Sequence, residues 1–144
     1  MGYMTETLDA RVNARVPSRL KHDLAALARR RHVDESELAR TLLDEALRRE
    51  RHPGIVFRST PTGREAAIEG RRVYVWQVME TVWASAGVID ESATFLGLRP
   101  EQVSAAVDYY ADYASEIDEL ITLNREDTER IHKLSERQQK ARRR

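Results

Sequence analysis

Seven residues near the N-terminus alternate strictly between polar and apolar side chains and then stop at a proline. The segment ARVNARVP places Arg11, Asn13 and Arg15 at every second position, with alanine or valine between them. Because successive side chains of a strand point to opposite faces, this spacing predicts a strand over Ala10–Val16. Arg and Asn do not favour strands by themselves, so the polar face needs an explanation of its own.

Helical spacing replaces this alternation from Ser18, and Pro17 suits the first position of a helix. The first stripe of apolar residues consists of Leu20, Leu24, Leu27 and Ala28. The stretch RRRHVDES ends this helix, and Asp34 or Ser36 can cap a second one. The second stripe consists of Leu38, Leu42, Leu43, Ala46 and Leu47. Pro53 and Gly54 then mark a domain boundary.

A single strand followed by two helices cannot satisfy its backbone hydrogen-bonding groups. Residues 55–68 could supply a partner strand, but they lie beyond two helices and the Pro53–Gly54 break. We therefore expect the same strand of a second chain, paired antiparallel in a two-stranded ribbon. The valine faces would cover four helices, and the polar faces would project outward. Such a ribbon fits the DNA major groove, where Arg suits guanine and Asn suits adenine.

Residues 9–50 resemble the ribbon-helix-helix fold of the Arc, CopG and MetJ repressors, and the Asn-x-Arg-x-Pro spacing is similar to that of Arc. The resemblance implies a homodimer that contacts operator bases through Arg11, Asn13 and Arg15. It also implies a phosphate anchor at the N-terminus of the second helix. The residues expected there are Arg30, Arg31, Asp34, Glu35 and Ser36. The chain departs from the family at His32, where glycine is usual, and at the two carboxylates, which repel phosphate. The alternative is an exposed hairpin whose arginines only confer solubility.

Short strands are predicted at residues 55–57 and 66–68, joined through the turn-prone TPTG. The segment VYVWQVMETVW begins a helix, or a strand that leads into one. A helix, a turn and another helix follow, with Asp90 as a candidate cap, Gly97 as a stop and Pro100 in a first turn. The last helix is expected to continue along a heptad-like stripe from Val103 to Ile131. The expected fold class is therefore mainly α, with a small β element in each half.

Residues 55–120 resemble a small bacterial domain with a winged-helix-like core, which is often encoded beside PIN-type nuclease toxins. Gly63, Gly70, Arg72, Val73 and Val75 carry this resemblance. The presumed recognition helix is acidic at Glu101, Asp108 and Asp112 and would repel phosphates. We therefore expect residues 53–122 to form a dimerisation or partner-docking domain. Its aromatic residues are either interface or core residues: Trp76, Trp83, Tyr109, Tyr110 and Tyr113.

The formal net charge of zero conceals a strong asymmetry near the C-terminus. Residues 101–129 contain one Arg and nine Asp or Glu, whereas residues 130–144 contain seven Arg or Lys and one Glu. We expect residues 123–144 to form a C-terminal helix and basic tail, with residues 135–144 mobile in the free protein. The resemblance implies that this segment binds a toxin. The residues expected to do so are Leu123, Ile131, Leu134, Arg137, Lys140, Arg142 and Arg143.

In that interpretation the apolar residues occupy a groove, and an arginine pairs with the carboxylates that bind metal in a PIN-type nuclease. The alternative is a solubilising tail or a non-specific phosphate-binding arm.

No enzyme, metal or cofactor is expected. The histidines His22, His32, His52 and His132 lack ligand spacing, and no glycine-rich phosphate loop or nucleophile elbow appears. The chain lacks cysteine, which suits a reducing cytoplasm, and its longest apolar run is too polar to span a membrane. The expected function is a DNA-binding antitoxin that represses its own operon and neutralises a PIN-type nuclease toxin. A stand-alone ribbon-helix-helix regulator, a plasmid-partition protein and a purely structural adaptor are the alternatives.

Overall fold

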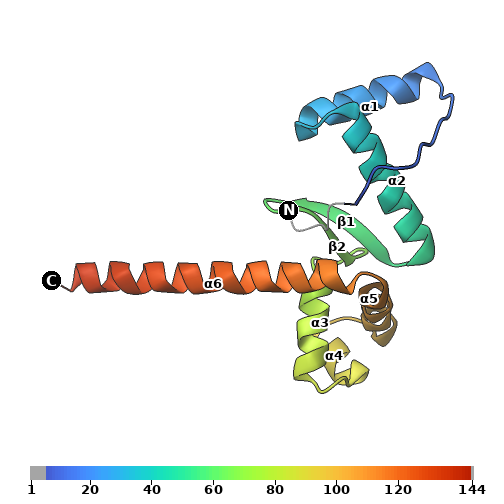
Figure 1. Ribbon diagram of the computed structural model, residues 1–144. Helices are drawn as coiled ribbons and strands as arrows, with labels where there is room; N and C mark the ends of the chain where they lie inside the picture. Colours follow the sequence, from blue (N-terminus) through green and yellow to red (C-terminus); the bar gives the residue numbers. More distant parts are fainter. Residues whose placement is uncertain (1–5, 144) are drawn as a thin grey trace. The chain divides into compact units, whose positions relative to one another are not determined.

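The computed structural model describes residues 6–143 and is mainly helical (Figure 1). In this part of the chain it contains six helices and one two-stranded antiparallel sheet, which confirms the expected fold class at this level. The described residues up to Pro53 form one compact unit, and those from Gly54 onward form another. The division falls at the Pro53–Gly54 dipeptide.

The first unit contains two helices, α1 (Ser18–Arg31) and α2 (Glu35–Arg51). His32 ends α1 in the left-handed conformation, with φ 56° and ψ 42°. Of the two candidate caps for α2, the structure uses Asp34, whose carboxylate accepts a hydrogen bond from the Glu37 amide at 2.7 Å. Ala28 of α1 and Leu38 of α2 are the buried residues of the two apolar stripes.

The segment before α1 does not form the predicted strand in the single chain. Residues 6–17 contain neither helix nor strand. The possible intramolecular partner, residues 55–68, is already paired with itself in a hairpin. Ala10–Val16 therefore has no ladder of hydrogen bonds within the described chain, and a strand cannot form without one.

The hairpin of the second unit consists of β1 (Ile55–Thr60) and β2 (Gly63–Ile68), each longer than predicted. Ile55 pairs with Ile68 and Thr60 with Gly63, so Pro61 and Thr62 alone form the turn. The Thr60 hydroxyl donates to the Gly63 carbonyl at 3.0 Å and closes this turn. The hairpin confirms the predicted strands and precedes all the helices of its unit.

Three helices follow the hairpin: α3 (Val75–Ala84), α4 (Ile89–Leu96) and α5 (Pro100–Asp112). The ambiguous segment is thus helical, and only Tyr74 before it makes an isolated bridge to Ala67 of β2. Gly97 ends α4 with φ 66°, and Pro100 starts α5, as predicted. The expected Asp90 cap is wrong, because Val88 precedes the helix and Asp90 lies in its first turn.

The last helix, α6 (Ala114–Arg142), is separate from α5. The predicted continuous stripe from Val103 to Ile131 is wrong, because Tyr113 interrupts the helix with φ −130° and ψ 40°. Figure 1 shows α6 leaving α5 in a new direction. The break allows Ile117 and Ile121 to enter the same core as the buried residues of α5.

The core of the second unit lies between the hairpin, α3, α5 and the beginning of α6. Its buried members include Ile55, Ile68, Val75, Val78, Val103, Ala106, Tyr109 and Ile117, each at most 2% exposed. Burial of these side chains provides the main favourable term in the folding of this unit. The second unit thus has an extended core, whereas the first unit buries only Ala28 and Leu38 among its described apolar residues.

Candidate nucleic-acid and partner interfaces

The alternating segment exposes both of its faces in the single chain. Arg11, Asn13 and Arg15 are exposed, as the outward face requires. The apolar face is exposed too: Val12 retains 78% and Val16 49% of its accessible surface. A valine face open to water is unfavourable, and contiguous exposed apolar surface is typical of interaction sites.

The two helices of the first unit offer a matching apolar surface. Leu20, Leu43 and Leu47 are exposed large hydrophobic residues, Leu47 at 62%. Among described residues 6–53, Ala28 and Leu38 are the only apolar residues that are fully buried. A unit of this size with so little buried apolar surface is marginal by itself. Its sequence therefore contains more apolar surface than one copy can cover.

The N-terminus of α2 is occupied by the chain's own carboxylates. The Asp34 side chain binds one free amide of this terminus, and Glu35 forms an ion pair with Lys21 of α1. Ser36 is exposed at the same end. A phosphate at this terminus would compete with the Asp34 carboxylate for the free backbone amides. The positive charge for phosphate binding would therefore have to come from arginines nearby. Arg30 is exposed and Arg31 half-buried in the last turn of α1, immediately before this terminus.

The helix-turn-helix of α4 and α5 presents an acidic face. Glu101, Asp108 and Asp112 are exposed on α5, and such carboxylates repel phosphates. Two tyrosines of α5 instead bind carboxylates of α6. Tyr109 donates to Glu116 at 2.7 Å and Tyr110 donates to Asp118 at 2.8 Å. These bonds join the two helices across the break at Tyr113.

The aromatic residues of this unit divide between core and surface. Tyr109 is fully buried, and its ring lies 4.6 Å from that of Tyr113 and 6.2 Å from that of Phe57. Trp83 contacts Tyr110 edge-to-face at 5.4 Å and is 46% exposed. Core packing therefore accounts for Tyr109, while Trp83 is also available at the surface.

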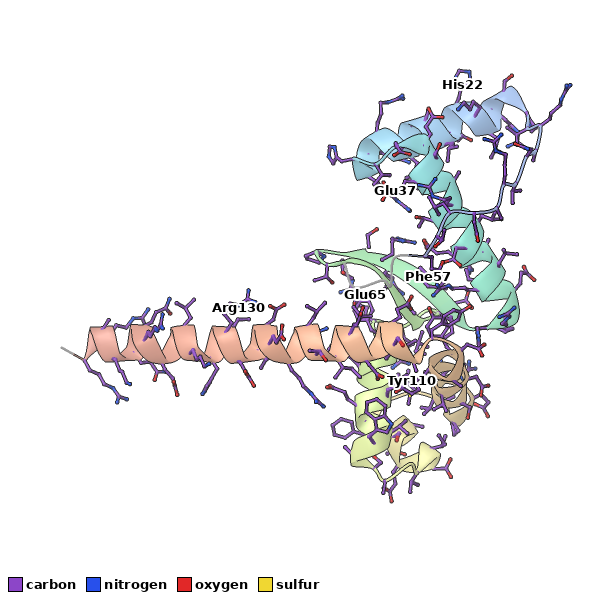
Figure 2. All side chains as sticks on the ribbon, in the orientation of Figure 1. His22, Glu37, Phe57, Glu65, Tyr110 and Arg130 are labelled. Carbon is purple, nitrogen blue, oxygen red and sulfur yellow. The ribbon has the colours of Figure 1, made fainter. Side chains whose placement is uncertain are left out.

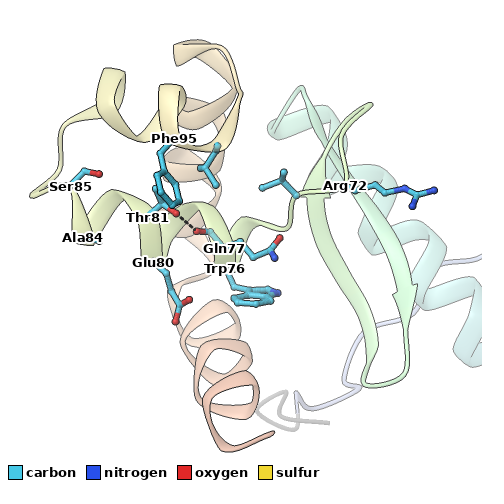
Figure 3. Close-up of a pocket in the computed structure, with 10 residues that line it drawn as sticks. Arg72, Trp76, Gln77, Glu80, Thr81, Ala84, Ser85 and Phe95 are labelled. Carbon is cyan, nitrogen blue, oxygen red and sulfur yellow. Dashed lines mark hydrogen bonds between the residues drawn. The ribbon is translucent and has the colours of Figure 1, made fainter. Parts of the chain in front are cut away.

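A groove on α3 and α4 was missed by the sequence analysis. It has a volume of about 720 Å³, and Trp76, Gln77, Glu80 and Phe95 are among its lining residues (Figure 3). Phe95 is 80% exposed, and the indole N–H of Trp76 is buried without a hydrogen-bond partner in the described part of the chain. Phe95 lies on α4 away from the stripe that contains the buried Ala93. An apolar side chain outside the core stripe was the sign of this surface in the sequence.

The second part of α6 extends away from its own unit (Figure 2). Ile117 and Ile121 are buried, whereas every residue from Arg125 to Arg143 is exposed. The predicted C-terminal helix and basic tail of residues 123–144 falls within α6, which begins before this segment at Ala114 and reaches Arg142. Residues 135–142 are thus helical in the structure, and their mobility in the free protein stays a prediction.

The predicted partner-binding residues all lie on this exposed helix or directly after it. They comprise the apolar residues Leu123, Ile131 and Leu134 and the basic residues Arg137, Lys140, Arg142 and Arg143, all of them exposed. Arg125 forms an ion pair with Glu80 of α3 at 3.4 Å and marks where α6 leaves its unit. Beyond it, Arg130 pairs with Asp127 at 3.3 Å within the helix.

Comparison with known proteins finds no family model, no curated protein and no solved structure that matches this chain. Among residues 6–143, no three His, Cys, Asp or Glu side chains form a group that could hold a metal ion. Over the same residues, no helix is both long and apolar enough to cross a membrane.

Proposed function

We propose that the protein is a DNA-binding repressor that acts as a homodimer through residues 9–52, with a ribbon-helix-helix arrangement. The observation that carries this proposal is the alternating segment Ala10–Val16, which exposes a valine face and an Arg-Asn-Arg face together. A second copy supplies the missing strand pairing, and its helices cover the exposed valines and leucines. The outward faces of the two strands then lie side by side and present six polar side chains to one major groove.

In this proposal the three polar residues of each strand have distinct partners. Arg11 and Arg15 donate two hydrogen bonds each to guanine O6 and N7, and Asn13 pairs with adenine N6 and N7. Arg30 and Arg31 bind backbone phosphates at the end of α1. These phosphate contacts position the dimer, and the base contacts determine its preferred sequence. The capped N-terminus of α2 contributes less to phosphate binding than an uncapped one would, because Asp34 and Glu35 carry negative charge there.

The proposal is tested by DNA binding to the region upstream of the protein's own gene. Arg15→Ala is compared with Arg40→Ala, which removes the same charge from an exposed position of α2. Loss of a bidentate contact is expected to weaken specific binding by about 1–3 kcal/mol and to relax one base position. Arg40→Ala should cause only a small, sequence-independent change. Equal binding by wild type and Arg15→Ala would exclude a base-contacting role for this residue.

A toxin-neutralising role is the more specific form of the proposal, and the exposed half of α6 favours it. An amphipathic helix with Leu123, Ile131 and Leu134 on its surface fits an apolar groove on a partner. Its basic end would then pair with metal-binding carboxylates of a PIN-type nuclease. A stand-alone regulator without such a partner is the alternative. A nuclease gene adjacent to this one would favour the antitoxin, and its absence would favour the alternative.

Truncation after Leu134 distinguishes the roles of the basic end. The antitoxin proposal predicts unchanged operator affinity and weaker inhibition of the neighbouring gene's nuclease. If truncation instead lowers operator affinity and its dependence on salt while inhibition stays complete, these residues form a phosphate-binding arm.

A further inference from the structure

The joint between α5 and α6 consists of a single residue, Tyr113 (Figure 1). Helical hydrogen bonds continue on both sides of it. The Tyr113 amide donates to the Tyr109 carbonyl at 3.0 Å, and the Ile117 amide donates to the Tyr113 carbonyl at 3.3 Å. The sequence contains neither glycine nor proline after Pro100, so no residue of the joint has a backbone that prevents a continuous helix. The local sequence therefore does not require the bend.

Two backbone amides lose their helical acceptors at this joint. In a continuous helix, Ala114 and Ser115 would donate to the carbonyls of Tyr110 and Ala111. In the bent chain these amides belong to the first turn of α6 and make no hydrogen bond within the described residues. The apolar spacing of residues 103–121 also continues through the joint in steps of four and three. Local structure therefore favours a straight joint, and the packing of α6 opposes it.

The contacts that hold α6 in its bent position are specific to this helix. Ile117 and Ile121 lie in the core of the second unit, and Arg125 forms an ion pair with Glu80 of α3. The hydrogen bonds between tyrosines of α5 and carboxylates of α6 add to these contacts. A straight joint in a single chain would expose both isoleucines and leave the core without them, which is unfavourable. A straight joint therefore needs another segment with the same side chains at the same spacing, and a second copy of α6 is such a segment.

We propose that α6 is exchanged between two copies of the chain, with Tyr113 as the hinge. In the exchanged dimer, α5 and α6 of each copy form one continuous helix, and the α6 of each copy fills the core of the other. Every contact between α6 and the rest of its unit is then made between chains instead of within one. The amides of Ala114 and Ser115 gain their helical acceptors in addition. Exchange of an identical element is a general route by which proteins form dimers.

This exchange does not depend on DNA binding by residues 9–52. The exposed residues from Arg125 to Arg143 make no contact with the core, so they stay exposed in the exchanged dimer and remain available to a partner. In a repressor that is already dimeric through its ribbon, exchange of α6 would provide a second link between copies.

Chemical cross-linking of full-length variants tests the exchange, because the chain has no cysteine of its own. Glu80→Cys and Arg125→Cys place thiols at the contact between α3 and α6, whose partly exposed ion pair contributes little stability. The two single variants, each with a different tag, are co-expressed and treated with a short bis-maleimide. The proposal predicts a cross-linked dimer that contains one copy of each variant. If the double variant links within its own chain while the co-expressed single variants never link to each other, the exchange is excluded.

A matched control replaces Glu80→Cys by Glu91→Cys, at an exposed position of α4. Co-expressed with Arg125→Cys, it should remain unlinked. Linkage equal to that of Glu80→Cys would mean that two copies are merely close together, and would overturn the proposal. A double variant of Glu80 and Arg125 that forms no link of either kind would overturn it as well, because the contact between α3 and α6 would then be absent.

Substitutions of Ser115 test the hinge itself. Ser115 is exposed, and proline is tolerated in the first turn of a helix but not in its interior. Ser115→Pro should therefore preserve the link within the double variant, while it lowers linkage between the single variants roughly a hundredfold. Ser115→Ala keeps the amide and favours a helix, so it should not lower linkage between chains. Linkage between chains that is unchanged by Ser115→Pro would contradict a continuous helix through Tyr113.

Discussion

His32 shows how a single residue departs from what its backbone position favours. It ends α1 with φ 56°, a left-handed conformation that glycine adopts without steric cost. Its amide still binds the Arg29 carbonyl at 3.3 Å, so the backbone of the cap is formed despite the side chain. The sequence resemblance had identified this position as one where glycine is usual, and the left-handed φ gives the physical reason.

His32→Gly should therefore stabilise the protein. A non-glycine residue in this conformation costs about 1–2 kcal/mol, part of which glycine loses again through its greater freedom in the unfolded chain. We expect a net increase of about 1 kcal/mol in the free energy of unfolding, measured by urea denaturation of the full chain. His32→Ala is the control and should give no gain, because alanine has the same steric conflict. A destabilised His32→Gly protein would show that the imidazole makes a contact that matters more than the strain.

Tyr110 has a raised pKa because its hydroxyl donates a hydrogen bond to Asp118, with burial and the negative charge of Asp118 as smaller causes. The neutral phenol is favoured in the folded state. Its contribution to stability is thus complete below the ordinary tyrosine pKa of about 10 and is lost as the pH rises through the raised pKa. Because the tyrosine is only half-buried and solvent screens the interaction, the effect on stability should be small.

Asp118→Ala should return the pKa of Tyr110 toward its ordinary value, since all charge and hydrogen-bond effects come from this carboxylate. The titration is followed by NMR of the labelled tyrosine ring, which resolves Tyr110 from the other tyrosines. Asp108→Ala, a charge change on the exposed face of α5, should leave it unchanged. A Tyr110 titration that does not move in Asp118→Ala would mean that the hydrogen bond is absent in solution.

At the scale of elements, local pattern predicted most of what the structure contains. Gly97 ends α4 and Pro100 begins α5 as predicted, and the TPTG turn lies at the tip of the hairpin. Pro17 lies one residue before α1, not at its first position. The break at Tyr113 could not be predicted, because the apolar spacing continues through it. The break results from tertiary packing: Ile117 and Ile121 reach the core only if α6 changes direction.

The candidate interfaces were predictable to different degrees for a similar reason. The two-residue alternation identified the ribbon segment, and the excess of Arg and Lys identified the basic end of α6. Both features are properties of a local stretch of sequence. The groove with Trp76 and Phe95 is formed by two helices together, and neither helix alone indicates it. The pairing of Ala10–Val16 depends on a second chain, so a single chain provides the pattern of a strand without its hydrogen bonds.

Val12→Pro tests the ribbon as an element. Proline removes a donor from the proposed inter-chain ladder and should abolish dimerisation of the N-terminal unit and specific DNA binding together. The control is Leu8→Pro, which lies in the same exposed segment before the predicted strand and should preserve both. Sedimentation and DNA binding are measured on the same samples. A Val12→Pro protein that remains fully active would show that this segment acts without strand pairing.

At the scale of the whole molecule, the two units differ in how complete they are. The second unit buries a core of its own, from Ile55 to Ile121. The first unit leaves Val12, Val16 and Leu47 exposed and buries only Ala28 and Leu38 among its described apolar residues. The second unit therefore has a core of its own, whereas the first has exposed apolar surface that the proposed dimer would cover. The helix α6 adds a second exposed surface, which contains Ile131 and Leu134 and ends in basic residues.

In the proposed dimer, Ala10–Val16 becomes a strand by pairing with the same segment of a second copy. The most direct measurement is an isotope-filtered NMR experiment on a dimer of one labelled and one unlabelled chain. The proposed pairing predicts inter-chain NOEs between backbone protons of this segment, and between the Val12 and Val16 methyl groups and leucines of the other copy. A segment without inter-chain NOEs in a protein that still binds its operator specifically would contradict this pairing.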